Sequence, residues 1–235
     1  MRYLFFLLLL NYTVLSAQES KILVFHKTNG WYHESIPTGV KTFKELGREN
    51  GFAVTATEDA QHFSEGGLEK FKLVVFLNTT GDVLNEEQQK AFENYMNNGG
   101  NFFGIHSAAD TEYDWPWYGK LVGAYFVNHP AVQEAEVQVV KKDHPTVAHL
   151  PESWKRTDEW YNYKEINPNI EVLMLLNEAS YEGGENENYH PIAWFRELDG
   201  GGKAIYTGGG HTKESYDEEG FKEHLLKSIF FAIQD

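Results

Sequence analysis

The sequence predicts an α/β fold: a doubly wound, mostly parallel flavodoxin-like sheet with helices on both faces. In the first half of the chain, short apolar runs of strand length alternate with segments whose apolar residues recur at helical spacing. Near the C-terminus, residues 221–233 carry apolar side chains along one helical face. Alternating strands and helices of this kind form parallel sheets, so we expect the last helix to pack on such a sheet.

The first half supplies four expected strands and two expected helices. A helix over 34–50 follows from Ile36, Val40, Phe43 and Leu46, and Gly51 ends it. A second helix begins at Asn85, has Glu86 and Glu87 in its first turn, and ends at the Asn-Asn-Gly-Gly run 97–100. The expected strands are 21–26, 53–57, 73–77 and the run that leads to residue 106.

The second half is less regular. Residues 110–128 predict a loop and a partial helix over the strand ends, where specificity usually lies. Residues 134–140 alternate as a half-exposed strand, 172–176 form a buried strand, and 192–195 and 204–207 form a final pair that turns at Gly200–Gly202.

Residues 1–17 have the features of a signal peptide. Met1-Arg2 is followed by an apolar run from Tyr3 to Leu10, and Ala17 is the small residue before the expected cut. An uncleaved anchor is the competing interpretation, but Asn11 interrupts the run well short of the ~20 residues needed to span a bilayer. We expect an exported protein, periplasmic or extracellular, with one domain over 18–235 and no stable membrane insertion after cleavage.

Composition narrows the classes of partner. The chain has no cysteine, so it has neither disulfides nor a thiol nucleophile, and its net charge of −15 argues against nucleic acid and anionic lipid. Aromatic residues make up 15% of the chain, and Trp31, Trp115 and Trp160 lie beside polar residues. This pattern fits stacking on a small carbohydrate, although aromatics of the core and its rim explain it nearly as well. The oligomeric state stays open.

Two histidines at strand ends are the first candidates for catalysis. His106 ends a buried strand, and ligands of open α/β sheets bind outside the carboxyl ends of the strands. His211 follows another strand and the glycines 208–210, which let backbone approach a ligand closely. If the two strands are neighbours, the two imidazoles converge. The alternatives are a core histidine for His106 and a simple turn or helix cap for His211.

Other histidines and carboxylates complete the expected site. Five of the ten histidines fall where a strand or loop meets polar or glycine-rich sequence: His26, His33, His106, His129 and His211. Asp158 and Glu159 are adjacent carboxylates, and because successive strand residues face opposite sides we expect at most one of them in the pocket. Glu159 is the one chosen, with a surface ion pair as its alternative role, and Asp110 is the other candidate carboxylate. Histidines with carboxylates also bind divalent metals such as zinc, with His106 and His211 as candidate ligands, but no HxH or HxxxH spacing occurs.

Several ordered motifs resemble the trehalose-utilisation (ThuA-like) family. They cover essentially the whole mature chain: Lys27–Ile36, Gly99–Thr111, Gly123–Phe126, His129-Pro130, Asp143–Pro145, Asp158–Tyr161, His190–Trp194, Tyr206-Thr207 and His211-Thr212. The resemblance implies a class I glutamine amidotransferase-like fold in which His106 stands where the amidotransferases place a nucleophilic cysteine. Lys213 also stands where those enzymes need a carboxylate, so glutamine hydrolysis is excluded.

Taken together with the expected signal peptide and the candidate histidines and carboxylates, the family resemblance implies an exported enzyme that acts on a sugar or keto-sugar by histidine/carboxylate acid-base or metal-assisted chemistry. His106, His211, Glu159 and Asp110 would be catalytic, and His33, Trp31, His129, Trp115 and Trp160 would bind substrate. No NAD or FAD is expected, since no Gly-x-Gly-x-x-Gly follows the first strand. The alternative is a non-catalytic carbohydrate-binding or accessory module on the same fold.

Overall fold

The fold is built on a nine-stranded sheet, seen in a computed structural model that describes residues 19–234. The expected signal peptide and its cut lie outside the described residues. From one edge to the other the strands are β2 (Phe52–Thr57), β1 (Ser20–Phe25), β3 (Leu73–Leu77), β4 (Phe102–Ile105), β11 (Lys203–Thr207), β10 (Pro191–Glu197), β9 (Glu171–Asn177), β6 (Gln133–Val139) and β7 (Ser153–Asp158).

The sheet is mostly parallel, as the sequence predicts. The neighbours from β2 to β11 pair in parallel, whereas the pairs from β11 to β7 are antiparallel. Together these pairings make seven of the nine strands run in one direction. The switch follows from the connections: β10 and β11 are joined by a tight turn at Gly200–Gly202, and such a turn can only join antiparallel strands.

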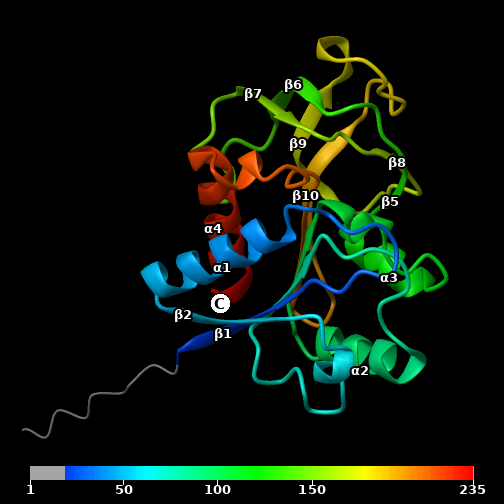
Figure 1. Cartoon of the computed structure of the whole chain (residues 1–235), viewed down its shortest axis with the longest axis vertical. Coiled ribbons are helices and arrows are strands. Elements are labelled where there is room, and N and C mark those ends of the chain that lie inside the picture. The colour runs from blue at the N-terminus through cyan, green and yellow to red at the C-terminus, as the bar shows by residue number, and fades with distance from the viewer. Residues whose placement is uncertain (1–18, 235) are drawn as a thin grey trace, which may run out of the picture.

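Helices cover both faces of the sheet, with α1 and α4 on one side and α2 and α3 on the other (Figure 1). Their bounds are Ile36–Asn50 for α1, Glu86–Asn97 for α2, Pro116–Val122 for α3 and Glu219–Ile233 for α4. Gly51 ends α1 in the left-handed conformation, at a φ of 77°. Asn85 begins α2 with a capping box, in which its side chain accepts from Gln88 N while the Gln88 side chain accepts from Asn85 N.

Three strands of the second half are absent from the expectations. β7 covers a segment that reads as irregular, because its polar residues Lys155, Arg156 and Asp158 hide the strand alternation. β5 (Tyr125–Asn128) and β8 (Asn162–Lys164) form a separate two-stranded sheet. Together β7, β5 and β8 bracket Glu159 and His129, so the region missed from the sequence is the one that shapes the site.

An aromatic core fills the space between the sheet and α2 and α3. Phe76 of β3 stacks on Phe92 of α2 and on Tyr118 of α3, with ring centroids 5.5 and 5.6 Å apart. All three side chains are fully buried, so they fix both helices against the central strands. Within residues 19–234, no helix is both long enough and apolar enough to cross a membrane.

Candidate functional site

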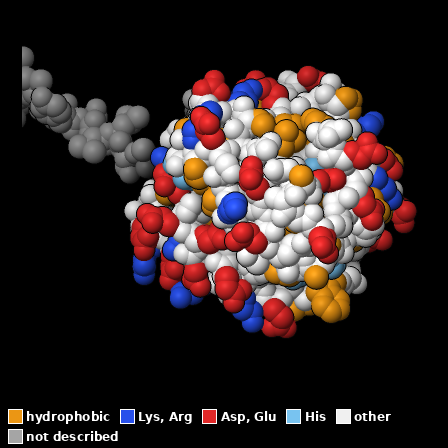
Figure 2. All heavy atoms as spheres, turned by 90° about the horizontal axis from the view of Figure 1, so that it is seen from above, with side chains coloured by type: hydrophobic (Ala, Val, Ile, Leu, Met, Phe, Trp, Pro, Cys, Tyr) orange, Lys and Arg blue, Asp and Glu red, His pale blue; other side chains and the backbone are white. Residues whose placement is uncertain are grey.

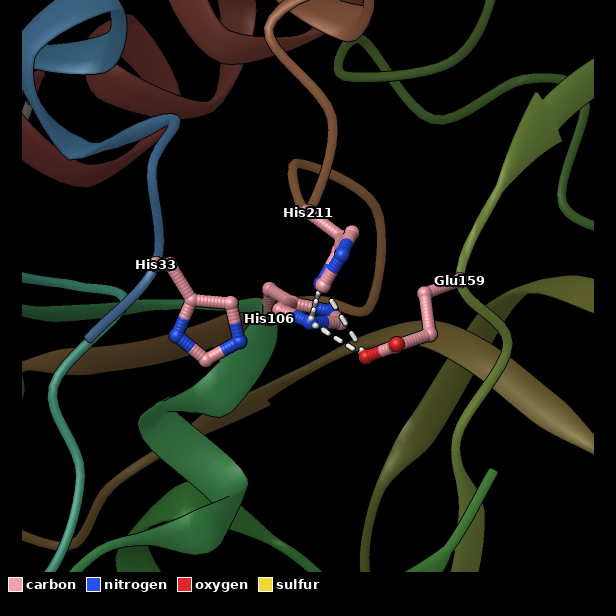
Figure 3. A group of neighbouring side chains, drawn as sticks. All are labelled: His33, His106, Glu159 and His211. Carbon is pink, nitrogen blue, oxygen red and sulfur yellow. Dashed lines mark hydrogen bonds and ion pairs between the residues drawn. The ribbon is translucent and has the colours of Figure 1, made fainter. Parts of the chain in front are cut away.

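The site lies at the carboxyl ends of β4 and β11, which are neighbouring parallel strands. His106 directly follows β4, and His211 follows β11 after three glycines. His33 comes from the loop after β1, and Glu159 directly follows β7. Figure 3 shows these four side chains pointing towards one another from four separate segments. We call them the His/Glu quartet.

The ligand atoms of the quartet are close together. His211 Nδ1 lies 3.0 Å from Glu159 Oε2 and 3.3 Å from His106 Nε2, and His106 Nε2 lies 3.4 Å from Glu159 Oε2. One donor atom from each of the four residues lies within 4.8 Å of the other three. The imidazoles of His106 and His211, which are expected to converge if their strands are neighbours, therefore lie together, and the ring of His33 lies beside them.

The backbone and ring of His106 are both held in place. Its φ is +47°, in the left-handed region, and Tyr206 Oη donates a 2.7 Å hydrogen bond to its carbonyl oxygen. On the ring, Nδ1 lies 2.9 Å from Gly208 O. Because a carbonyl oxygen only accepts, Nδ1 carries a proton, and Nε2 is the ring nitrogen that faces Glu159 and His211.

His33 is buried next to two other imidazoles. Its side chain is 3% exposed, and its Nδ1 lies 3.3 Å from Ser107 Oγ, while another ring nitrogen points towards His106 (Figure 3). Burial, followed by the nearby His106 and His211, lowers the pKa of His33 to about 2. His33 is therefore a neutral ring with a lone pair to offer at neutral pH.

Glu159 divides its two oxygens between two groups of histidines. Oε2 faces His106 and His211, and Oε1 lies 3.1 Å from Nδ1 of His129. Burial acts to raise the pKa of the Glu159 carboxyl, but the contacts with His106 and His211 outweigh burial and hold that pKa below its usual range. The carboxylate is therefore anionic at neutral pH.

His129 belongs to the site but not to the quartet. Its Nδ1 also lies 2.9 Å from Pro130 O, a carbonyl oxygen that only accepts, so this nitrogen donates and Nε2 is the nitrogen left without these two partners. The side chain is 41% exposed, in contrast to the buried His106. His129 thus fixes Glu159 from the outside and presents its second nitrogen near the surface.

Asp158 holds the loop that carries His211. It is fully buried, and it accepts from the backbone N–H groups of Gly210 and His211 at 2.8 and 3.1 Å. Arg156 Nη2 lies 3.1 Å from the same carboxylate. The other side of Gly210 is held as well, since its carbonyl oxygen accepts from Ser35 and Asn78.

Asp110 lies beside the quartet without bonding to it. Its carboxylate accepts a 2.7 Å hydrogen bond from Tyr113 Oη. Burial raises the pKa of Asp110, and the bond from Tyr113 offsets part of that rise. Its role in catalysis stays a prediction.

The three candidate tryptophans lie in different surroundings. Trp31 is 72% exposed and lies two residues before His33. Trp160 is fully buried, and its Nε1 donates to Gln133 O, while the buried Trp115 donates to Glu93. The structure therefore does not offer a free ring face on Trp115 or Trp160 to a sugar, because tertiary packing places both in the core.

Two contributors to the site are missing from the expectations. Tyr161 packs on the His106 ring, with centroids 4.1 Å apart, and covers it from the side of β5. Asp158 is the second. The sequence does carry a signal for both, because Asp158 and Tyr161 flank Glu159 in one short segment, but which neighbour faces which way depends on the unrecognised strand β7.

The donor set suits two kinds of chemistry. Neutral imidazoles and a carboxylate can move protons between themselves and a bound hydroxyl or carbonyl group. The same nitrogen and oxygen atoms are the ones that bind zinc and related divalent ions.

Comparison with known proteins gives a family and a fold. A family model described as trehalose utilisation (ThuA) matches residues 21–232. A search of curated proteins gave no match.

Several solved structures share the fold. A ThuA-like protein from Bacteroides uniformis is 26% identical, with 93% of this chain and 94% of that chain covered and a TM-score of 0.77. A ThuA-like protein from Parabacteroides merdae is 20% identical, with 92% and 91% covered and a TM-score of 0.76. A glutamine amidotransferase from Thermotoga maritima is 11% identical, with 93% and 100% covered and a TM-score of 0.54, and so shares the fold alone.

Proposed function

Because this chain belongs to the trehalose utilisation (ThuA) family, we propose that it is an exported enzyme that acts on a sugar or keto-sugar. The reaction is a hydrolysis, or a lyase or isomerase reaction, carried by the His/Glu quartet through acid-base or metal-assisted chemistry. One observation carries the proposal: three buried or half-buried imidazoles and one anionic carboxylate from four distant segments converge at the carboxyl ends of parallel strands.

Bringing these side chains together costs folding free energy, and a purely structural role does not explain that cost. Burying His33, His106 and Glu159 removes three polar groups from water, and His106 also adopts a left-handed backbone. Strained and desolvated groups concentrate at reactive sites because the surrounding fold holds them there. Two hydrogen bonds supply that support: His106 Nδ1 donates to Gly208 O, and Tyr206 Oη donates to His106 O.

His129 and Asp110 are the groups for proton exchange with substrate. His129 is oriented by Glu159 and has its Nε2 near the surface, so it can take up or release a proton there. Asp110, with its raised pKa, can supply a proton from the neighbouring segment. His/carboxylate pairs of this type serve hydrolysis and enolisation equally well.

The ligand proposed for the surface near the site is a small carbohydrate. Trp31 offers an exposed indole two residues from His33, and sugar rings stack on such faces. The net charge of −15 and the acidic side chains spread over the face drawn in Figure 2 support a neutral ligand over nucleic acid. Export is supported by the apolar run from Tyr3 to Leu10 behind Met1-Arg2.

Glutamine amidotransfer is excluded by chemistry. The chain has no cysteine, and His106 occupies the turn after β4. An imidazole cannot replace the thiolate that displaces ammonia from the glutamine side chain and forms the γ-glutamyl thioester in those enzymes. The fold shared with the amidotransferases therefore carries no activity over to this chain.

Turnover on keto-disaccharides tests the proposal. The mature protein is incubated with keto-disaccharides and with the parent disaccharides, and products are followed by mass spectrometry. Glu159→Gln keeps the shape of the side chain and removes its charge, and we expect kcat/KM to fall by about 10²-fold or more, the range of a lost proton-transfer group. His62→Ala, a half-buried histidine outside the site, is the matched control and should leave the rate unchanged.

Other outcomes separate the alternatives. Saturable sugar binding without product, unchanged in Glu159→Gln, would support a non-catalytic carbohydrate-binding module instead. Neither binding nor turnover with any sugar would contradict the proposed substrate class.

A further inference from the structure

We propose that the His/Glu quartet binds one divalent transition-metal ion, with His33, His106, His211 and Glu159 as the protein ligands. The role of this ion in turnover rests on the proposed function, whereas its binding does not. The proposal stands on the spacing of the donor atoms, the arrangement of the rings, and the bonds that orient each ligand.

The donor atoms are spaced as metal ligands are. Zinc bonds of about 2.0–2.1 Å in tetrahedral geometry separate neighbouring ligand atoms by about 3.4 Å. The three measured separations among His106 Nε2, His211 Nδ1 and Glu159 Oε2 are 3.0, 3.3 and 3.4 Å. These three atoms therefore outline one face of a tetrahedron of the right size for such an ion.

The distances between the three imidazole rings also fit tetrahedral coordination. Their ring centroids form a nearly equilateral triangle, with 5.0 Å from His33 to His106, 5.1 Å from His33 to His211 and 5.2 Å from His106 to His211. With about 1.1 Å from nitrogen to ring centre added to each bond, tetrahedral zinc would place its histidine centroids about 5 Å apart. The rings are also steeply inclined, at 72° to 88°, so they converge edge-on instead of stacking.

The outer hydrogen bonds leave lone pairs facing inwards. Gly208 O fixes the proton of His106 on Nδ1, so Nε2 is free to ligate. Ser107 Oγ contacts His33 at Nδ1, and His129 contacts the Glu159 oxygen that faces away from the other rings. Ligands of bound metals are held by such outer bonds, which set the tautomer and the direction of each ring.

The backbone of the fourth ligand is held too. Asp158 accepts from the N–H groups of Gly210 and His211, which fixes the loop that carries the ring. His211 Nδ1 is the nitrogen that faces the other donors. Thus each of the four ligands is positioned by a group that does not itself ligate.

The donor set indicates the class of ion. Three imidazole nitrogens and one carboxylate oxygen suit zinc, cobalt and other first-row divalent ions, and they do not suit calcium or magnesium, which prefer all-oxygen sites. Among the residues the structure describes, the quartet is also the one group of three or more His, Cys, Asp or Glu side chains with this spacing.

Direct binding of Zn²⁺ and Co²⁺ tests the proposal. Untagged protein is stripped with chelator, dialysed and titrated calorimetrically, and Co²⁺ binding is read from its visible absorption. We expect one ion per chain. His211→Ala should weaken binding more than about 100-fold, beyond the loss that outer-shell changes cause. This side chain is 24% exposed, so its removal is better tolerated than that of the fully buried His106.

Glu159→Gln and the matched control His62→Ala complete the set. Glu159→Gln should also lose affinity, whereas His62→Ala should bind as the parent does. No binding at one ion per chain, or binding that survives both His211→Ala and Glu159→Gln, would overturn the proposal. Circular dichroism of each variant establishes that it is folded before the titration is interpreted.

Activity assays keep the two proposals distinct. Turnover by chelated protein, without metal binding, would contradict the metal site and leave the sugar enzyme standing. Stoichiometric metal without any turnover would leave the metal site standing and contradict the enzyme.

Discussion

Asp158 is the single residue whose change should separate positioning from folding. It receives bonds from Gly210 and His211 and from the hydroxyl of Ser215, and it pairs with Arg156. All of these groups donate, so the buried carboxylate accepts hydrogen bonds from several sides. It touches no atom of the quartet's metal-facing side and acts only through the His211 loop.

Asp158→Asn should weaken both the fold and the site. The amide keeps the shape, but its NH₂ group faces donors and Arg156 loses its buried partner, so the free energy of unfolding should fall by about 3 kcal/mol. Zinc affinity should fall about 10- to 100-fold. Urea unfolding and zinc titration at a temperature where the variant is fully folded measure the two effects.

The exposed Asp143→Asn serves as the control. A loss of stability with unchanged zinc affinity would show that Asp158 is structural only. The pair of Asp158 and Glu159 is visible in the sequence, and strand alternation predicts that at most one of them enters the pocket. Which one does so depends on strand β7, and the role of Asp158 depends on the loop it meets in the fold.

At the scale of single residues, the sequence predicts histidines better than tryptophans. His106 and His211 can be placed because each follows a strand and neighbouring parallel strands end at the same edge. Trp115 and Trp160 cannot be placed in this way, because flanking polar residues do not reveal that both rings are buried and that Glu93 and Gln133 accept from their indole N–H groups.

The loop between β11 and His211 is sensitive to substitution at Gly210. Gly210 has a φ of +110°, and a Cβ there would lie 2.9 Å from Tyr216 Oη and 3.0 Å from Ile105 Cγ2. The backbone of this loop therefore adopts a conformation that only glycine takes easily, and its neighbours leave no room for more.

Gly210→Ala should displace His211 as well as destabilise the fold. We expect a loss of about 1–3 kcal/mol in the free energy of unfolding from backbone strain, together with weaker zinc binding. Gly51→Ala is the matched control: Gly51 also has a positive φ, +77°, but has no atom within 4 Å of an added Cβ. If both variants bind zinc equally well, the loop does not position His211.

At the scale of elements, periodicity predicts the first half of the fold and most of the second, but it misses the strands β5, β7 and β8. The buried strands β1, β3 and β4 are uniformly apolar, and α1 and α2 carry clear signals at their ends. β7 is a polar edge strand, and β5 and β8 have four and three residues, too few to show alternation. Their existence depends on pairing between distant segments.

Across the whole molecule, a buried histidine should make the fold sensitive to acid. His224 of α4 is fully buried, its Nδ1 lies 2.9 Å from Thr146 O, and burial lowers its pKa from 6.5 to about 4. The unfolded chain therefore binds more protons between these two values, so stability rises with pH through this window and is lost as the pH falls from 6.5 towards 4. This residue alone accounts for up to about 3 kcal/mol of that loss.

His224→Asn should flatten this dependence. An asparagine NH₂ can replace the bond to Thr146 O but cannot be protonated, so the variant is less stable at pH 7 yet loses less stability on acidification. Urea unfolding at pH 7, 5.5 and 4.5 measures the slope, with His62→Asn as the control. An unchanged slope would mean that His224 titrates normally in the folded state.

The alternation of strands and helices determines the overall topology, whereas the site depends on both the parallel and the antiparallel halves of the sheet. Strand order alone brings β4 and β11 together, but Glu159 reaches them only because the antiparallel half of the sheet returns through β7. Four segments thus meet at one edge of the sheet. The two that are farthest apart in the sequence carry His33 and His211, which are separated by 178 positions. No local pattern encodes such a meeting.

Anomalous diffraction from crystals of the zinc-loaded protein tests the central claim most directly. We predict one strong peak at the zinc edge, about 2.0–2.2 Å from a ring nitrogen of each of His33, His106 and His211 and from an oxygen of Glu159. A peak elsewhere, or an ordered quartet bonded only to itself in crystals grown with excess zinc, would contradict the account.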